Sequence, residues 1–348
     1  ARFLADDTAA YAADRDRALE MDRWNAGFFV TVAELAVRRG RYRDAVRLAA
    51  EGVATDSTAW DARAVLGTNQ LRTGAIDAAR ASLERAFAGD PYNVWTKNTL
   101  DLMDRLAGFE TVRTDRFELV LDPGEAALLA PYAGEFAEAA FDALAERWGY
   151  SPELPVRLEI YPRHADFSVR TVGLTGLGAL GVAFGNVLAM DSPAARDPGA
   201  FHWGSTLWHE VAHTFTLGMT DHRIPRWLTE GISVREERRS RPGWGEPVSL
   251  GFLQAFRSDR LLPMARIDAG FVRPTYPGQV GISYQHGSVA VELIEHDHGD
   301  DAIRRMLDAY RDGADTEAVF RDVLGTSFEA FDHRLDASKS LLPNHGDA

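Results

Sequence analysis

The sequence contains no cysteine among its 348 residues. A disulfide framework is therefore excluded, and any metal ion must be held by histidine and carboxylate side chains. Lysine is also scarce: the sequence has two lysines, Lys97 and Lys339, and 36 arginines. We attribute this bias to genome base composition. No stretch approaches the roughly 18 apolar residues of a transmembrane helix, so no membrane span is predicted.

Basic residues are outnumbered by acidic ones. The formal net charge is −14 and the isoelectric point is about 5.2, which argues against nucleic acid or an anionic membrane as a main partner. The chain opens with Ala1-Arg2-Phe3, without Met or the apolar core of a signal peptide. We therefore expect a processed or trimmed form whose export signal has gone, and we lean to an extracytoplasmic (periplasmic or secreted) bacterial location.

The length suggests two domains, and 45% apolar residues are enough for a sizeable core. Residues 1–109 are expected to be helical and to contain an internal repeat. Ala26–Thr55 aligns with Trp60–Gly89 at an offset of 34 residues, which pairs Gly40 with Gly74. Small residues let paired helices approach, and the two glycines turn the chain between them.

This segment resembles two tetratricopeptide repeats followed by a further helix at Asn93–Leu106. Two repeats are few for an independent array, so we expect them to pack against the second domain or to continue N-terminally in a longer chain. The repeats either form a groove for a peptide or partner protein or serve as a structural spacer.

The second domain is predicted to span residues 110–340, with strands at Phe117–Leu121 and Val156–Tyr161. A turn at Asp122–Gly124 leads into a long amphipathic helix, Glu125–Trp148. A glycine-rich run then enters residues 182–190, which are predicted to form a hairpin or edge strand. No Gly-Lys-Ser/Thr follows, so nucleotide binding is rejected. The edge strand either holds an extended substrate or has no substrate role.

A metal-binding pattern lies in Leu207–Phe215, where His209 and His213 are four positions apart. On a helix both imidazoles reach one metal ion, and Glu210 projects beside it. The helix is expected to be buried, with Ser205 or Thr206 as its N-cap. Buried imidazoles and a buried carboxylate need partners, which favours a metal site over an accident of spacing.

A second helix, Arg226–Glu237, carries Glu230 among apolar neighbours. We expect Glu230 to be the third metal ligand, which leaves one position open for water; the alternative is a salt-bridged glutamate. Glu236 and Glu237 are possible partners of the ligating imidazoles. From about residue 250 the chain is predicted to be helical, including a helix from Ile282 to about His298, before a tail at 341–348.

The pattern His209-Glu210-x-x-His213 followed by Trp227-Leu228-Thr229-Glu230-Gly231 resembles the gluzincin metallopeptidases. It is most similar to the bacterial peptidase MA-like domains and more distantly to aminopeptidase N. The resemblance implies an α+β, mostly helical protein: helical repeats, then a thermolysin-like catalytic domain with a small mixed sheet and a helical C-terminal part. It also implies one Zn²⁺ ion, with Tyr284 of Tyr284-Gln285-His286-Gly287 stabilising the oxyanion.

The sequence departs from aminopeptidases in three respects. The interval between His213 and Glu230 is shorter, no Gly-x-Met-Glu-Asn segment precedes the metal helix, and His286 stands where a lysine is usual. The missing segment grips a free substrate amine, so aminopeptidase activity is not implied.

The predicted activity is zinc-dependent hydrolysis of peptides or proteins. A zinc-bound water has its pKa lowered towards about 7, Glu210 acts as the general base, and Tyr284 donates to the oxyanion. Two alternatives remain: a catalytically idle zinc-binding module whose repeats are a protein-interaction scaffold, and a zinc hydrolase of a non-peptide substrate. The intact Glu210 favours an enzyme, because an idle site has no chemical need for a base.

Overall fold

The computed structural model describes residues 2–176, 178–245, 248–258 and 260–337. The predicted tail at 341–348 and the last residues of the domain predicted over 110–340 lie outside these residues. Among the described residues, no helix combines the length and the apolar character that crossing a bilayer requires. The chain is mostly helical with one five-stranded mixed sheet, which confirms the α+β prediction.

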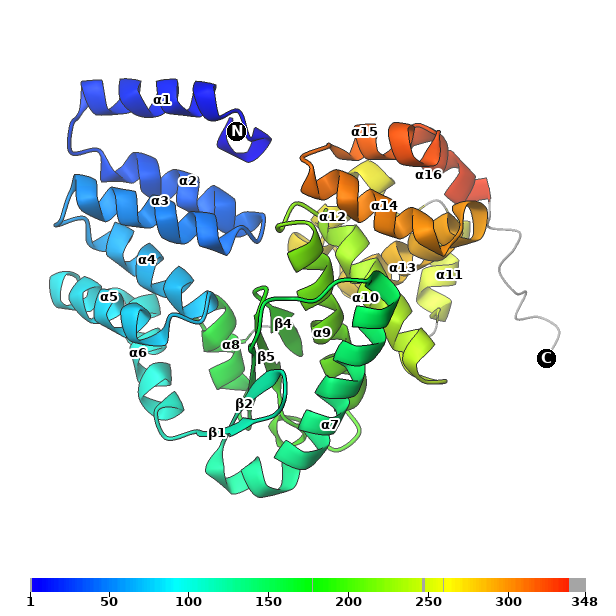
Figure 1. Cartoon of the computed structure of the whole chain (residues 1–348), viewed down its shortest axis with the longest axis horizontal. Coiled ribbons are helices and arrows are strands. Elements are labelled where there is room, and N and C mark those ends of the chain that lie inside the picture. The colour runs from blue at the N-terminus through cyan, green and yellow to red at the C-terminus, as the bar shows by residue number, and fades with distance from the viewer. Residues whose placement is uncertain (1, 177, 246–247, 259, 338–348) are drawn as a thin grey trace. The chain divides into compact units, whose positions relative to one another are not determined.

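Six helices in residues 8–106 repeat with a period of 34 residues (Figure 1). One series starts at residues 8, 42 and 76, and the other at residues 26, 60 and 94, so the predicted offset is confirmed. The last helix starts at Val94 because the Asn93 side chain accepts the N–H of Thr96 at 3.0 Å. The six are α1 (Thr8–Met21), α2 (Ala26–Arg38), α3 (Tyr42–Thr55), α4 (Trp60–Arg72), α5 (Ile76–Gly89) and α6 (Val94–Leu106).

The turn between paired helices recurs three times. Gly40 and Gly74 have φ values of 70° and 83°, and Asp6 occupies the equivalent position with a φ of 53°. In each turn this residue donates its N–H to the carbonyl three positions back, at 2.9, 3.3 and 3.1 Å respectively. The 3₁₀ turn η1 (Phe3–Ala5) therefore corresponds to the last turns of α2 and α4.

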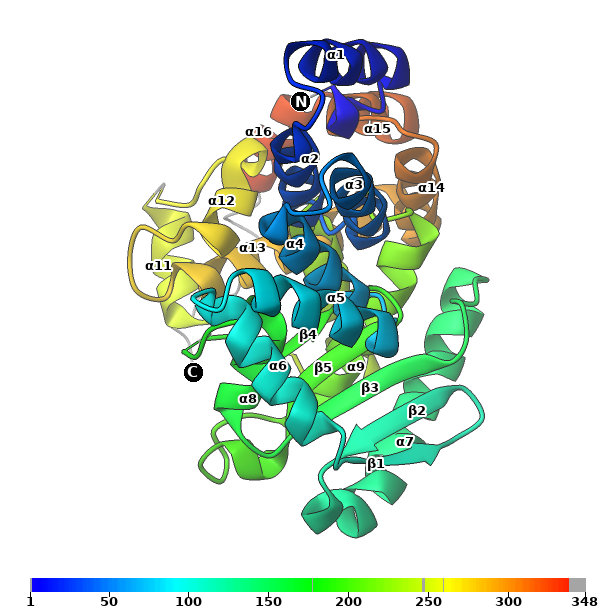
Figure 2. The ribbon, with the colours of Figure 1, turned by 90° about the vertical axis from the view of Figure 1, so that its left-hand side faces the viewer.

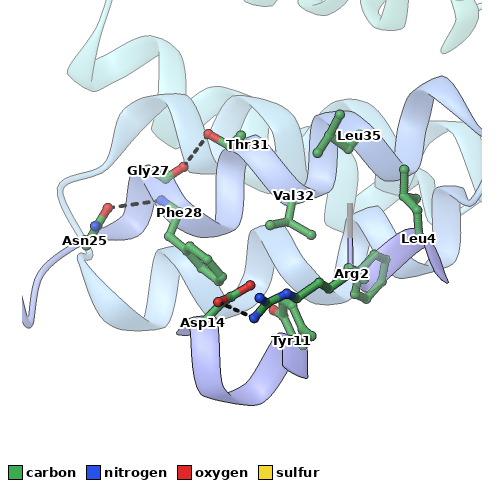
Figure 3. A pocket seen from close by; sticks show the side chains of 11 residues that line it. Arg2, Leu4, Tyr11, Asp14, Asn25, Gly27, Phe28, Thr31, Val32 and Leu35 are labelled. Carbon is green, nitrogen blue, oxygen red and sulfur yellow. Dashed lines mark hydrogen bonds and ion pairs between the residues drawn. The ribbon is translucent and has the colours of Figure 1, made fainter. Parts of the chain in front are cut away.

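A cavity of about 460 Å³ lies between η1, α1 and α2 (Figure 3). Arg2 and Asp14 form an ion pair of 2.8 Å at its wall, and the Asn25 side chain accepts the N–H of Phe28 at 3.1 Å. The rest of the lining is largely aliphatic and aromatic. The Arg2–Asp14 ion pair ties the start of the chain to α1, and the Asn25 contact caps α2.

The sheet has the order β1-β2-β3-β5-β4 (Figure 2), with β2, β3 and β5 parallel and the two edge strands antiparallel. The hairpin predicted over residues 182–190 is confirmed as β4 and β5, whereas β1 was not predicted. The strands are β1 (Glu110–Arg113), β2 (Phe117–Leu121), β3 (Val156–Tyr161), β4 (Gly181–Ala183) and β5 (Val187–Asp191).

Both faces of the central strands are covered. On one face Tyr161 packs with Phe167 of α8 (His164–Val172) and Leu102 of α6. On the other, Phe117 meets Phe141 of α7 (Pro123–Trp148) edge to face. β3 is therefore covered on both faces, and among its residues Arg157 is the one that stays partly exposed. The turn predicted at Asp122–Gly124 is also wrong, because Pro123 and Gly124 already form the first turn of α7.

The remaining helices follow the sheet in the chain. They are η2 (Pro193–Ala195), α9 (Trp203–Met219), α10 (Arg226–Ser240), α11 (Leu250–Arg257), η3 (Met264–Arg266), α12 (Ile267–Val272), α13 (Gln279–His298), α14 (Asp300–Arg311), α15 (Thr316–Val319), the π-helical turn η4 (Phe320–Leu324) and α16 (Phe328–Ala337). The helical character predicted from about residue 250 is confirmed within the described residues.

The density of contacts divides the chain into two compact units. One contains Ala1–Ala143 with Ser151–Thr214, and the other contains Leu144–Tyr150 with the chain from Phe215 onward. The repeats and the sheet fall in the first unit and share a hydrophobic cluster. The domain boundary that we placed at residue 109 stays a prediction.

Candidate metal centre

α9 carries the His-Glu-x-x-His pattern and begins earlier than predicted. The N–H of Ser205 donates to Nδ1 of His202 at 3.1 Å, so the imidazole acts as the N-cap. The predicted cap at Ser205 or Thr206 is wrong because a histidine supplies the acceptor. The helix is buried, as expected, including Leu207, Val211 and Phe215.

His209 and His213 lie one turn apart on α9. Their rings approach with centroids 4.7 Å apart and an interplanar angle of 81°. Both side chains are almost inaccessible to solvent. Helical periodicity therefore directs two imidazoles to one buried place.

α10 supplies Glu230, and another helix fixes where α10 starts. Pro225, at the N-cap, makes no side-chain cap of its own. The Asp268 carboxylate, from α12, accepts the N–H of Trp227 at 2.8 Å instead. A carboxylate at this end is also favoured by the helix dipole, so it stabilises the first turn.

Two further contacts fix the position of Glu230. The hydroxyls of Thr216 and Thr229 are 2.6 Å apart, which ties α9 to α10 beside Glu230. Nε of Arg226 donates to Oε1 of Glu230 at 3.2 Å, one helical turn away. Glu230 itself is buried, so this donor restricts the carboxylate orientation.

The ligand atoms of His209, His213 and Glu230 all lie within 4.8 Å of one another. Three ligand atoms about 2.0–2.2 Å from a tetrahedral zinc ion lie roughly 3.3–3.6 Å from one another. Side-chain rotations that shorten the present separations by about an ångström would therefore place all three around one ion. Two imidazoles and one carboxylate are also the donor set of catalytic zinc sites. Among the described residues, this is the group of three that fits a metal ion.

Glu210 lies against the edge strand of the sheet. A Cβ atom added to Gly181, the first residue of β4, would be 2.4 Å from Oε1 of Glu210. Only glycine permits this approach, so the carboxylate lies directly beside the strand backbone. The other edge of β4 pairs with no strand in the described part of the chain.

A family model described as Peptidase MA superfamily matches residues 136–339, more than half of the chain. The chain belongs to this superfamily. No curated protein and no solved structure matched it. Membership supports a metallopeptidase that acts on a peptide or protein, and the superfamily is typically zinc-dependent. The matched region contains α9 and α10.

In this Peptidase MA chain, α10 and α13 cross at two glycines. A Cβ added to Gly231 would be 2.5 Å from the carbonyl oxygen of Gly287, and one added to Gly287 would be 2.7 Å from that of Trp227. The backbones therefore touch next to Glu230. Tyr284 lies one turn before this crossing on α13.

Tyr284 is half-buried, and its ring meets that of Phe271 edge to face at 5.1 Å. This contact orients the ring, while the oxyanion role of the hydroxyl stays a prediction. His286 is buried near the ring of Phe252. Burial lowers the pKa of His286 to about 4, so it is neutral at pH 7.

Glu236 is engaged away from the imidazoles. Its carboxylate forms ion pairs with Arg147 at 3.1 Å and Arg239 at 3.2 Å. Burial raises its pKa despite these cations. Sequence reasoning missed Arg226, although its i, i+4 spacing from Glu230 is a recognisable signal.

Proposed function

We propose that this protein is a zinc metallopeptidase of the gluzincin type with a thermolysin-like catalytic domain. His209, His213 and Glu230 would hold one zinc ion. The observation that carries the proposal is the convergence of these three side chains from two successive helices. The superfamily membership supports the same reaction class.

A zinc ion held there would lower the pKa of a bound water towards about 7 and polarise the substrate carbonyl. Glu210 accepts the proton of the attacking water and passes it to the leaving amine. The Tyr284 hydroxyl donates a hydrogen bond to the developing oxyanion. Arg226 keeps the Glu230 carboxylate in its ligating orientation.

The substrate lies extended along β4. The unpaired edge of this strand offers backbone N–H and C=O groups to a peptide. Because Gly181 touches Glu210, a peptide paired with the strand passes beside the base. A peptide substrate is favoured over a non-peptide one, since these strand groups recognise peptide backbone.

The helical repeats are of the tetratricopeptide type and offer a surface to a protein partner. The 34-residue period and the recurring left-handed turn support this assignment. Residues 1–109 form the repeat domain and residues 110–340 the catalytic domain.

The decisive experiment compares the wild type with Glu210→Gln for zinc content and for degradation of casein. We expect about one zinc per chain in both proteins, and a fall in kcat/KM of about 10²–10⁴ in the variant, because general-base catalysis contributes that much. Glu135→Gln, an exposed change on α7, is the matched control and should retain full activity.

A wild type that binds no zinc would refute the metal site. Stoichiometric zinc without casein or peptide cleavage in any of the three proteins would instead favour an idle module or a non-peptide substrate.

A further inference from the structure

The hairpin β4–β5 is held at its turn as well as along its strands. Gly185, in the turn, has a φ of 102°, and its carbonyl accepts a hydrogen bond from the Thr214 hydroxyl at 3.1 Å. Thr214 directly follows His213 on α9. One side of the hairpin turn is thus fixed by the helix that carries the two imidazoles.

The other side of the turn is fixed by the helical repeats. Phe184 directly follows β4 and is 4% exposed. Its ring meets Tyr42 of α3 edge to face at 5.4 Å, and the guanidinium groups of Arg170 and Arg72 lie 5.0 and 5.7 Å from its centre. The phenyl ring therefore fills a socket built from α3, α4 and α8.

Two arginines close this socket by a reciprocal exchange between helices. Arg170 of α8 donates to the carbonyl of Leu71 in the last turn of α4 at 2.9 Å. Arg72 of α4 donates to the carbonyl of Thr171 in the last turn of α8 at 3.0 Å. Each cation thus lies at the C-terminal end of the other's helix, where the helix dipole favours it.

The two arginines differ in what their removal leaves behind. Arg170 is fully buried and pairs with the fully buried Glu159 at 2.6 Å, so its loss removes one of the two cations that neutralise this carboxylate. Arg72 donates to a backbone carbonyl and, at 3.2 Å, to the side-chain oxygen of Asn69, and it lies over two rings; all of these groups are neutral. Arg72 can therefore be changed without leaving a buried charge.

We propose that Arg72 and Arg170 are positioning residues: through Phe184 they fix the edge strand that lies beside Glu210. The repeats are then a structural support of the substrate-binding strand as well as a partner surface. This inference rests on the proposed function for its kinetic consequence. Its structural consequence, a rigid strand, does not depend on any activity.

The test is Arg72→Met, with amide hydrogen exchange of residues 181–187 as the first readout. We expect exchange there to accelerate about tenfold or more, because local opening becomes easier. On a peptide substrate, KM should rise about fivefold with kcat nearly unchanged, since alignment rather than chemistry is lost. Zinc content should stay the same, and Arg72→Lys should restore part of the protection.

Arg105→Met is the matched control. Arg105 also joins the repeats to α8, pairing with Asp166 at 2.7 Å, and Asp166 keeps Arg163 as a second partner. The control should leave exchange at residues 181–187 unchanged. Equal exchange in both variants and the wild type would overturn the inference, as would equal acceleration in both variants.

A second variant, Phe184→Leu, and the separate measurements of hydrogen exchange and peptide cleavage make the test decisive even if one of them fails. If Arg72→Met does not fold, Phe184→Leu is measured in the same way, with the same expectations. If the wild type cleaves no peptide, the proposed function fails while hydrogen exchange still decides whether the arginines fix β4.

Discussion

Single residues outside the His-Glu-x-x-His pattern orient Glu230, the proposed third metal ligand. Arg226 donates to its carboxylate at 3.2 Å. We expect Arg226→Ala to weaken zinc binding about 10- to 100-fold, as the loss of such partners typically does. Competition with a chromophoric chelator measures this change. Arg311→Ala, an exposed change on α14, should leave the zinc affinity unaltered, and equal losses in both variants would contradict the orienting role.

The proposed ligands are predictable from sequence, whereas the contacts that support them are not. His209 and His213 follow from helical spacing alone, because four residues make about one turn. The contacts of Gly181 with Glu210 and of Asp268 with Trp227 join positions 29 and 41 residues apart. No local pattern contains that information. The cap at His202 was missed for a different reason, since imidazole is an uncommon capping group.

Among the helices, the close crossing of α10 and α13 at Gly231 and Gly287 fixes the position of the neighbouring Glu230. We expect Gly231→Ala to lower the free energy of unfolding by about 1–3 kcal/mol, because the added methyl must push two backbones apart. Urea unfolding of the zinc-free protein measures this without a contribution from the metal. Zinc affinity should fall as well, since Glu230 is the neighbouring residue.

Gly281→Ala is a matched control on α13. A Cβ at this position would meet nothing within 4 Å. The same chemical change should then be neutral or stabilise by up to about 1 kcal/mol, because alanine favours helix more than glycine does. Similar losses in both variants would show that backbone propensity, rather than close approach, explains the effect at Gly231.

Helices and strands were predicted best where their own apolar pattern is strong. β2 and β3 have the predicted bounds, Phe117–Leu121 and Val156–Tyr161. β1 was missed because it is a short, mostly exposed edge strand, and only its pairing with β2 defines it. The burial of β3 on both faces was also missed, since Arg157 and Glu159 give it an alternating polar pattern.

At the scale of the molecule, the face of β3 that carries Arg157 and Glu159 is where the sheet meets the helical repeats. Glu159 pairs with Arg170 at 2.6 Å and Arg157 at 2.8 Å, and it accepts the hydroxyl of Tyr161 at 2.8 Å. Burial alone would raise the pKa of Glu159. The two guanidinium groups outweigh that effect and hold its pKa below the ordinary 4.5. The folded state therefore favours the ionised carboxylate.

This network predicts how the stability of the molecule depends on pH. The depressed pKa contributes stability that is complete above pH 4.5 and is lost as the pH falls through the lowered value. We expect Glu159→Gln to cost about 3–5 kcal/mol at pH 7, because it leaves buried guanidinium groups unpaired. The difference from the wild type should shrink on acidification, once the wild-type carboxyl is itself neutral. Urea unfolding at neutral and acidic pH measures both values, with Glu135→Gln as the exposed control. A difference that stays constant across this range would mean that side-chain packing, rather than charge, makes Glu159 important where the repeats meet the sheet.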